Sequence, residues 1–540
     1  MKKTVFTFLA LVSFAATLAA DATGILANGS WRKALRPEHP RLFLSAADLP
    51  ALRERIKTVN KADFERLKKE VDALPADAPF LPDASLYKVE ADGTIKPNRP
   101  GFQGAKLCKY DGGTQAAQCA LAYLMTGDKV YLEKTKSYLK LHAKILDWTA
   151  KGNVWMDLLG NTRINALAAY DWIYNDLTPA ERKELITPII DYIEKSQPEG
   201  GYKFRRTLGG ATDGNYGERA LEFFAGVVEA GNPGADPRAE AMLERGTRLF
   251  VEMMDHREKI SDGSGLLSAV TVGYTFGAYP YSSFNFIRAW KSAFGEDVSG
   301  NWVQMSDYPN WFDWSAIRIT PDGKFLYYGI GDLEHKDNLM GLSDLYTHFA
   351  QSVHFYGKAY PAKAARAYAL LQRFPEKSRV IRTMYPFVPF LIENFDPAEV
   401  VKADPAKTPE LPYFYAPSFG LLFMRSGKAD SDTFASFRFG ALNGNHQHYD
   451  ELSFIIYKYG FLALDSGSRT ESDHHHGFAP QSVAHNTILI HQPNEELPPF
   501  WKAWSYKPDP SGKVYYNHGG QSYNTLARPV ALQSNGRFIY

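Results

Sequence analysis

Residues 443–467 read NGNHQHYDELSFIIYKYGFLALDSG, and Ala484-His485-Asn486 follows a short way downstream. Two short apolar runs, 454–457 and 461–464, flank Gly460 in this stretch. Apolar runs of this length around a glycine turn are typical of a β-hairpin. The stretch therefore predicts a hairpin with its polar residues gathered at the ends.

Three of these polar residues, His448, Asp465 and His485, form a candidate metal-ligand set. A hairpin followed by one return strand would bring two imidazoles and one carboxylate together, a combination that suits zinc. The spacing matches no short zinc-finger or H-E-x-x-H signature, and single histidines are more often surface or core residues than ligands. Both interpretations stay open on the residues alone. His446 would lie beside the set and be free for chemistry.

The long N-terminal part of the chain is dominated by helical patterns. Gly127 ends one expected helix, Asp128 begins the next, and Thr178-Pro179-Ala180-Glu181 combines an N-cap, a proline at the first helical position and a capping-box glutamate. No alternating strand pattern intervenes between these helices. A helical repeat architecture, most naturally an (α/α) toroid, is therefore expected over residues 23–395.

Short β-type runs separated by Gly, Asn, Asp and Ser replace the helical pattern from Phe419 onward, after a proline-rich linker. They predict an antiparallel β-sandwich over residues 396–540. The sequence stops at Tyr540 within a strand-like run, so we expect this sandwich to be truncated at its C-terminus. The predicted fold class is α+β multidomain, a toroid followed by an incomplete sandwich.

Composition, charge and the N-terminal residues limit the cellular locations and the binding partners that this protein can have. The 540 residues carry a formal charge of +1, which argues against nucleic-acid binding driven by net charge. Residues 1–22 have the basic, apolar and small-residue regions of a secretory signal peptide, so we expect a periplasmic or secreted protein. No later stretch is long and apolar enough for membrane insertion. Cys108 and Cys119 could form one disulfide or remain two buried thiols.

Several segments resemble the heparinase II/III-like polysaccharide lyases. Residues Asn445–His448, Leu464–Ser468 and Ala484–Asn486 are similar to the central β-domain of that family. His39–Leu44 and Tyr170-Asp171-Trp172 are similar to segments of its toroid. The resemblance covers most of the chain, with heparinase II as the nearest member. It implies β-elimination on heparin-like or heparan sulfate-like glycosaminoglycan chains, with unsaturated uronate products.

β-Elimination requires a donor that neutralises the uronate carboxylate, a base for the C5 proton and an acid for the departing oxygen. The resemblance implies Asn215 as the neutralising donor, with Glu218 in the same segment. It implies Tyr274 and His446 as the proton-transfer groups, acting from opposite faces of the sugar. It also implies that zinc held by the metal-ligand set is structural, because this chemistry needs no metal-activated water.

Competing structural interpretations accompany these roles. Asn215 could be a helix N-cap, and relatives often carry Asn-His where this chain has Asn215-Tyr216. Tyr274 could serve aromatic packing, and Tyr279 and Tyr281 lie close to it in the sequence. The residues alone do not separate these alternatives.

The expected partner is an acidic polysaccharide. Arg205 and Arg206 could bind its sulfate or carboxylate groups or form a solvated charge cluster, and Arg469 is a candidate subsite cation. An alginate or other polyuronate lyase and a non-catalytic glycan-binding protein remain alternatives. A glycoside hydrolase is disfavoured because no convincing pair of carboxylates stands out. The sequence allows a homodimer and does not fix the oligomeric state.

Overall fold

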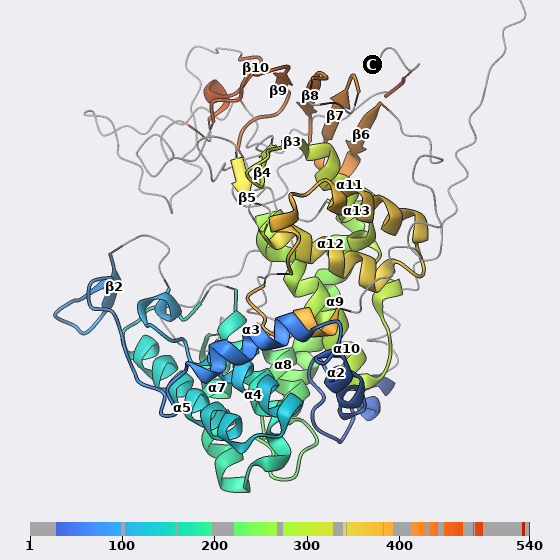
Figure 1. Cartoon of the computed structure of the whole chain (residues 1–540). Coiled ribbons are helices and arrows are strands. Elements are labelled where there is room, and N and C mark those ends of the chain that lie inside the picture. The colour runs from blue at the N-terminus through green and yellow to red at the C-terminus, as the bar shows by residue number, and fades with distance from the viewer. Residues whose placement is uncertain are drawn as a thin grey trace, which may run out of the picture.

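The computed structural model describes most of the helical part of the chain and a smaller share of its C-terminal part. The described residues are 29–98, 103–157, 159–196, 221–266, 274–327, 339–392 without 342 and 382, 412–440 without 428 and 430, 448–467, 479, 481–489, 532–534 and 539. In Figure 1 the helices fill the lower and middle parts of the molecule, and the C-terminal strands lie above them.

Helices make up most of the described chain before residue 393. They are α2 (Leu49–Arg55), α3 (Lys61–Asp72), α4 (Gly113–Thr126), α5 (Lys129–Lys151), α6 (Asn161–Trp172), α7 (Pro179–Ser196), α8 (Leu221–Glu229), α9 (Ala239–Ser261), α10 (Tyr279–Phe294), α11 (Gln304–Ser315), α12 (Ser343–Tyr356), α13 (Pro361–Gln372) and α14 (Val388–Leu391). The π-helix η6 (Tyr274–Ala278) leads directly into α10.

Local signals set the helix ends as predicted. Gly127 closes α4 with a left-handed φ of 74°, a conformation that glycine adopts without steric cost. The side chain of Asp128 accepts a hydrogen bond from the Val130 amide at the start of α5. Before α7, the Thr178 amide donates to Glu181 at 2.8 Å, and the Glu181 amide donates to the Thr178 hydroxyl at 3.2 Å. These reciprocal bonds confirm the capping box.

Neighbouring helices pack against each other around one large apolar core. Helices α8 and α9 approach each other closely at two glycines. A Cβ added to Gly246 would lie 2.1 Å from the Phe223 nitrogen, and one added to Gly226 would lie 2.4 Å from the Leu243 Cα. These two glycines allow the backbones of α8 and α9 to touch.

The segment that precedes the helices is fixed by one buried carboxylate on α6. Asp171 accepts hydrogen bonds from the backbone amides of Arg41 and Leu42, both at 2.8 Å, and from Nδ1 of His39 at 2.6 Å. The indole of Trp172 donates to the Leu42 carbonyl at 3.0 Å. Two segments singled out in the sequence for their family resemblance therefore bind each other, and they do so as a structural anchor.

The C-terminal part forms a five-stranded antiparallel sheet in the order β10-β9-β8-β7-β6. Its strands are β6 (Tyr413–Ala416), β7 (Leu421–Arg425), β8 (Phe434–Arg438), β9 (Phe454–Tyr457) and β10 (Phe461–Ala463). Phe461 pairs with Tyr457, so the predicted hairpin around Gly460 is confirmed. The predicted fold class, a helical domain followed by an antiparallel sheet domain, is confirmed as well.

A second antiparallel sheet within the helical part was not predicted. It consists of β3 (Ala316–Ile319), β4 (Lys324–Tyr327) and β5 (Leu339–Gly341), between α11 and α12 in the chain. Near the N-terminus, β1 (Tyr87–Val89) and β2 (Ile95–Pro97) form a small hairpin. Figure 1 shows β3 and β4 between the helices and the C-terminal sheet. The guanidinium of Arg425 on β7 donates to the carbonyls of Asp313 and Trp314, which ties the two parts together.

Three further expectations concern membrane-spanning helices, the two cysteines, and the signal peptide and domain boundary. No described helix combines the length and apolar character needed to cross a bilayer. Cys108 and Cys119 are free thiols, and burial raises their pKa values to about 11 and about 12. The expected signal peptide, residues 1–22, and the expected domain boundary at 395/396 lie outside the described residues.

Candidate functional site

The predicted site residues divide into two groups. Tyr274, His448, Asp465 and His485 lie in the described part of the chain. The others lie outside it, namely the candidate catalytic residues Asn215, Glu218 and His446 and the candidate substrate-binding residues Arg205, Arg206 and Arg469.

The three predicted metal ligands form a buried cluster at the end of the C-terminal sheet. Nδ1 of His485 lies 2.8 Å from Oδ1 and 2.9 Å from Oδ2 of Asp465, which follows β10. The imidazole of His448 lies beside that of His485, with 5.2 Å between ring centroids. Each of the three residues is less than one-tenth exposed. The structure therefore brings together the residues that the sequence singled out.

Small residues and backbone bonds hold the His485 segment against the end of β10. A Cβ on Gly467 would lie 2.3 Å from Cε1 of His485, so only glycine leaves room for the ring. The Ser466 hydroxyl donates to the Ala484 carbonyl at 2.6 Å. The Asn486 amide group donates to the carbonyls of Phe454 and Leu464, at 2.9 and 3.1 Å. These contacts hold the segment that contains His485 against the hairpin, as the predicted return segment.

A buried ion pair lies next to this cluster and was missed in the sequence. Nε of Arg438, the last residue of β8, lies 3.0 Å from Oδ1 of Asp450, and both side chains are almost fully buried. Burial opposes protonation of His485, but the hydrogen bond to Asp465 and the charges of Asp465 and Asp450 outweigh it and raise the His485 pKa. The sequence pattern gave no hint of this pair, because Arg438 lies within the run that forms β8 and Asp450 precedes β9, so only the pairing of the two strands brings them together.

The donor set of the cluster fits a zinc ion in part. Among the residues that the structure describes, the buried Nε2 of His485 has no hydrogen-bond partner, and this is the nitrogen that a metal ion would bind. Asp465 binds the opposite ring nitrogen, as carboxylates commonly do behind a metal-binding histidine. Within the described part of the chain, however, no three His, Cys, Asp or Glu side chains converge closely enough to hold a metal ion. Zinc binding at His448, Asp465 and His485 therefore stays a prediction.

The candidate catalytic Tyr274 is the first residue of η6. Its two tyrosine neighbours in sequence lie on α10 and are nearly inaccessible, Tyr279 at 3% and Tyr281 at 2% exposure. The Tyr281 hydroxyl donates to Asp344 at 3.1 Å, and burial raises the Tyr281 pKa. Neither neighbour can contact a polymeric substrate. Tyr279 and Tyr281 are therefore excluded as alternatives to Tyr274 for the proton-transfer role.

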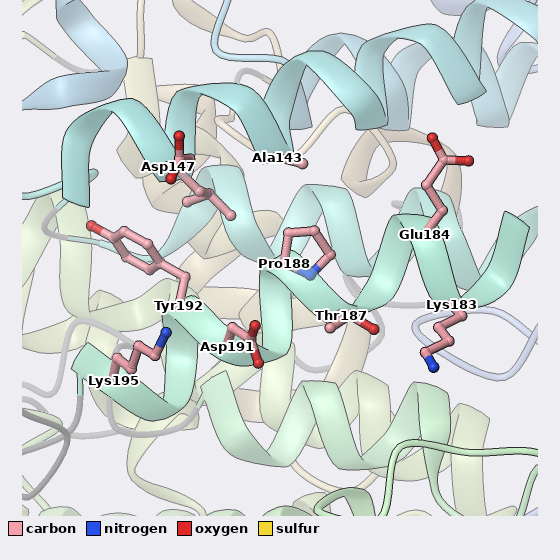
Figure 2. A pocket seen from close by; sticks show the side chains of 10 residues that line it. Ala143, Asp147, Lys183, Glu184, Thr187, Pro188, Asp191, Tyr192 and Lys195 are labelled. Atoms are coloured by element: carbon pink, nitrogen blue, oxygen red, sulfur yellow. The ribbon is translucent and has the colours of Figure 1, made fainter. Parts of the chain in front are cut away.

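An open pocket of about 500 Å³ lies between α5 and α7, and none of the predicted site residues is among its described lining residues (Figure 2). Its lining residues are Ala143, Leu146, Asp147, Lys183, Glu184, Thr187, Pro188, Asp191, Tyr192 and Lys195. The acidic members form ion pairs: Asp147 with Lys151 at 2.7 Å, Glu184 with Lys140 at 3.0 Å and Asp191 with Arg238 at 2.7 Å. This mixture of paired charges does not favour an acidic polymer.

Comparison with known proteins finds structural likeness only. No protein-family model and no curated protein matches the sequence. A crystal structure of heparinase III is similar, with 14% identity and a TM-score of 0.45 over 88% of this chain and 69% of that chain. The heparan sulfate lyase HepC from Pedobacter heparinus is similar with 14% identity and a TM-score of 0.39, over 85% and 71%. The functional interpretation therefore rests on the residues of this chain.

Proposed function

We propose that this protein is a polysaccharide lyase that cleaves uronic-acid-containing glycosaminoglycans by β-elimination. The observation that carries the proposal is the buried cluster of His448, Asp465 and His485. These residues are far apart in sequence, and the family resemblance implied that they would meet. Their proximity supports the resemblance for the segment that includes His446. The closer likeness to heparinase II stays a prediction.

The proposed chemistry assigns roles to three of the candidate catalytic residues. Asn215 donates a hydrogen bond to the uronate carboxylate, which stabilises the negative charge that grows when C5 loses its proton. Tyr274 or His446, depending on the configuration at C5, removes that proton. The electron pair forms the C4–C5 double bond while the C4–O4 bond breaks. The leaving O4 takes a proton from the second group, and the product ends in an unsaturated uronate.

We also propose a structural zinc ion at the cluster. Nε2 of His485, which has no hydrogen-bond partner among the described residues, and the neighbouring ring of His448 would hold the ion, with Asp465 as a ligand or as the group that orients His485. Bound zinc would cross-link the end of the hairpin to the return segment. Its removal would lower stability, because a metal that binds only the folded state adds its binding free energy to folding.

Metal analysis of the purified protein tests the zinc proposal. We expect one zinc per chain, and loss of zinc with a lower Tm in His448→Gln and His485→Gln. His142→Gln is the control, since it removes a buried histidine on α5, in the helical part of the chain, and should keep the zinc. Full zinc content in both cluster variants would rule out this site.

Absorbance of unsaturated uronate ends tests the activity. The full-length protein is incubated separately with heparin, heparan sulfate, chondroitin sulfate, alginate and ulvan, and Tyr274→Phe serves as the inactive variant. A rise with a glycosaminoglycan that is lost in the variant supports the proposal. A rise with alginate alone would favour a polyuronate lyase instead. Glycan binding without any rise would favour a binding protein and refute the lyase.

Secretion is part of the same proposal, because these polymers lie outside the cytoplasm. Fractionation of cells that express the full chain should place the protein in the periplasm or the medium. The N-terminal residue of the recovered protein should follow the expected signal peptide, residues 1–22. A cytoplasmic protein that keeps Met1 would contradict this location.

A further inference from the structure

The π-helix η6 is an unusual support for a candidate catalytic residue. It spans Tyr274–Ala278 and continues without a break into α10. Single π-helical turns are rare, wider than α-helical turns, and frequent at functional sites. Their stability depends on contacts from outside the turn. The neighbouring helices supply two such contacts to the backbone of η6.

Tyr308 on α11 makes the first contact. Its hydroxyl donates a hydrogen bond to the Thr275 carbonyl at 3.1 Å, and the side chain is fully buried. The next residue of η6, Phe276, stacks on Trp311 of the same helix with 4.4 Å between ring centroids. One turn of α11 therefore fixes both the backbone and a side chain directly after Tyr274.

His348 on α12 makes the second contact. Its Nε2 lies 3.4 Å from the Gly277 carbonyl, and its ring packs edge-on against Tyr281 with 4.4 Å between centroids. Complete burial lowers the His348 pKa to about 3, so the imidazole is neutral at physiological pH. A carbonyl only accepts hydrogen bonds, so the single ring proton lies on Nε2. His348 thus acts as a fixed neutral donor.

A third helix holds the turn that follows η6. Nη1 of the buried Arg257 on α9 lies 2.8 Å from the Ser282 hydroxyl and 3.0 Å from the Ser283 hydroxyl, both near the start of α10. The same nitrogen lies 3.4 Å from the Tyr279 carbonyl. The backbone from Thr275 to Ser283 is therefore anchored to three different helices.

We propose that Tyr308 and His348 are positioning residues for the proton-transfer step, acting through η6 on Tyr274. This inference rests on the proposed function, in which Tyr274 exchanges a proton with the sugar. Neither residue is exposed enough to reach substrate, so each acts only through the carbonyl that it binds. A displacement of about 1 Å in a reacting group can cost about 100-fold in rate, and the loss of either donor frees η6 to shift.

A matched pair of tyrosine variants tests this role. Tyr308→Phe removes the donor to Thr275 and keeps the ring. Tyr356→Phe is the control, because Tyr356 on α12 is equally buried and donates to a backbone carbonyl, that of Trp302 at 2.6 Å, away from η6. We expect Tyr308→Phe to lower kcat by about 10- to 100-fold with KM unchanged, while Tyr356→Phe keeps kcat. Equal effects in the two variants would overturn the proposal.

A second pair tests His348 and includes a rescue. His348→Gln retains an N–H near the position of Nε2, whereas His348→Met has similar bulk and no donor. We expect kcat to fall in His348→Met and to recover largely in His348→Gln. Equal loss in both variants would show that His348 acts through packing, which contradicts the positioning role.

Hydrogen exchange separates this inference from the proposed function. Backbone amides of residues 274–283 should exchange faster in Tyr308→Phe than in Tyr356→Phe. If Tyr274→Phe retains full activity, the assigned role of Tyr274 fails, and the positioning role fails with it. If Tyr274→Phe is inactive but Tyr308→Phe matches its control in both rate and exchange, only the present inference fails.

Discussion

Gly467 lies directly against the imidazole of His485, and a Cβ at Gly467 would meet Cε1 of that ring at 2.3 Å. His485 is also bound to Asp465, so the ring cannot move aside without breaking that hydrogen bond. The buried cluster at the end of the sheet therefore depends on a residue with no side chain.

Gly467→Ala is accordingly expected to destabilise the protein. Overpacking at a buried site typically costs about 1–3 kcal/mol, and here it would also displace His485. Urea unfolding and zinc content measure the two effects. Gly460→Ala in the β9–β10 turn is the control, because a Cβ there meets nothing within 4 Å. Equal stability of the two variants would contradict the close packing.

The Arg438–Asp450 pair gives a second prediction. Arg438→Met leaves a carboxylate buried without its counter-charge, which should cost about 3–5 kcal/mol in free energy of unfolding. The double variant Arg438→Met/Asp450→Leu removes both charges and should regain a large part of that loss. A double variant as unstable as the sum of the two single variants would show that the residues do not act as a pair.

Asp171 should be among the most sensitive positions of the helical domain. Asp171→Ala removes the acceptor for two buried backbone amides and for His39, and each unsatisfied donor costs about 1–3 kcal/mol. We expect a loss of at least about 3 kcal/mol in chemical unfolding. Asp176→Ala breaks only a partly exposed ion pair with Lys129 and should cost less than about 1 kcal/mol. Similar losses would argue against the anchor.

His142 makes stability depend on pH in a defined direction. Burial lowers its folded-state pKa to about 4, and its Nδ1 lies 2.9 Å from the Asp111 carbonyl. In the unfolded chain the pKa is about 6.5, so the unfolded state gains a proton first as pH falls. The stability contribution is complete above about pH 6.5 and is lost toward pH 4.

Between pH 7 and pH 5 the contribution of His142 to the free energy of unfolding falls by about 2 kcal/mol. Urea unfolding at both pH values should show that the decrease in stability is smaller by this amount in His142→Gln than in the wild type. The glutamine side chain can still donate to the Asp111 carbonyl. An identical decrease in both proteins would mean that His142 is protonated in the folded state.

Features that depend on neighbouring residues could be predicted from the sequence. The capping box at Thr178 and Glu181 and the glycine that ends α4 are set by bonds within one helical turn, so the residues themselves specify them. The hairpin around Gly460 follows for the same reason, because its strands are adjacent in the chain. The gathering of His448, Asp465 and His485 needed only this hairpin and one return segment.

Features that join distant segments appeared only with the tertiary structure. The anchoring of His39 by Asp171, the Arg438–Asp450 pair and the contacts of Tyr308 and His348 with η6 each depend on how whole helices or strands pack. The sheet β3–β5 was also not predicted, because its short strands lie between segments with strong helical patterns. Local sequence specifies the helices and strands through short-range hydrogen bonds. Packing around one shared core decides which distant polar groups become buried together and therefore form hydrogen bonds or ion pairs with each other.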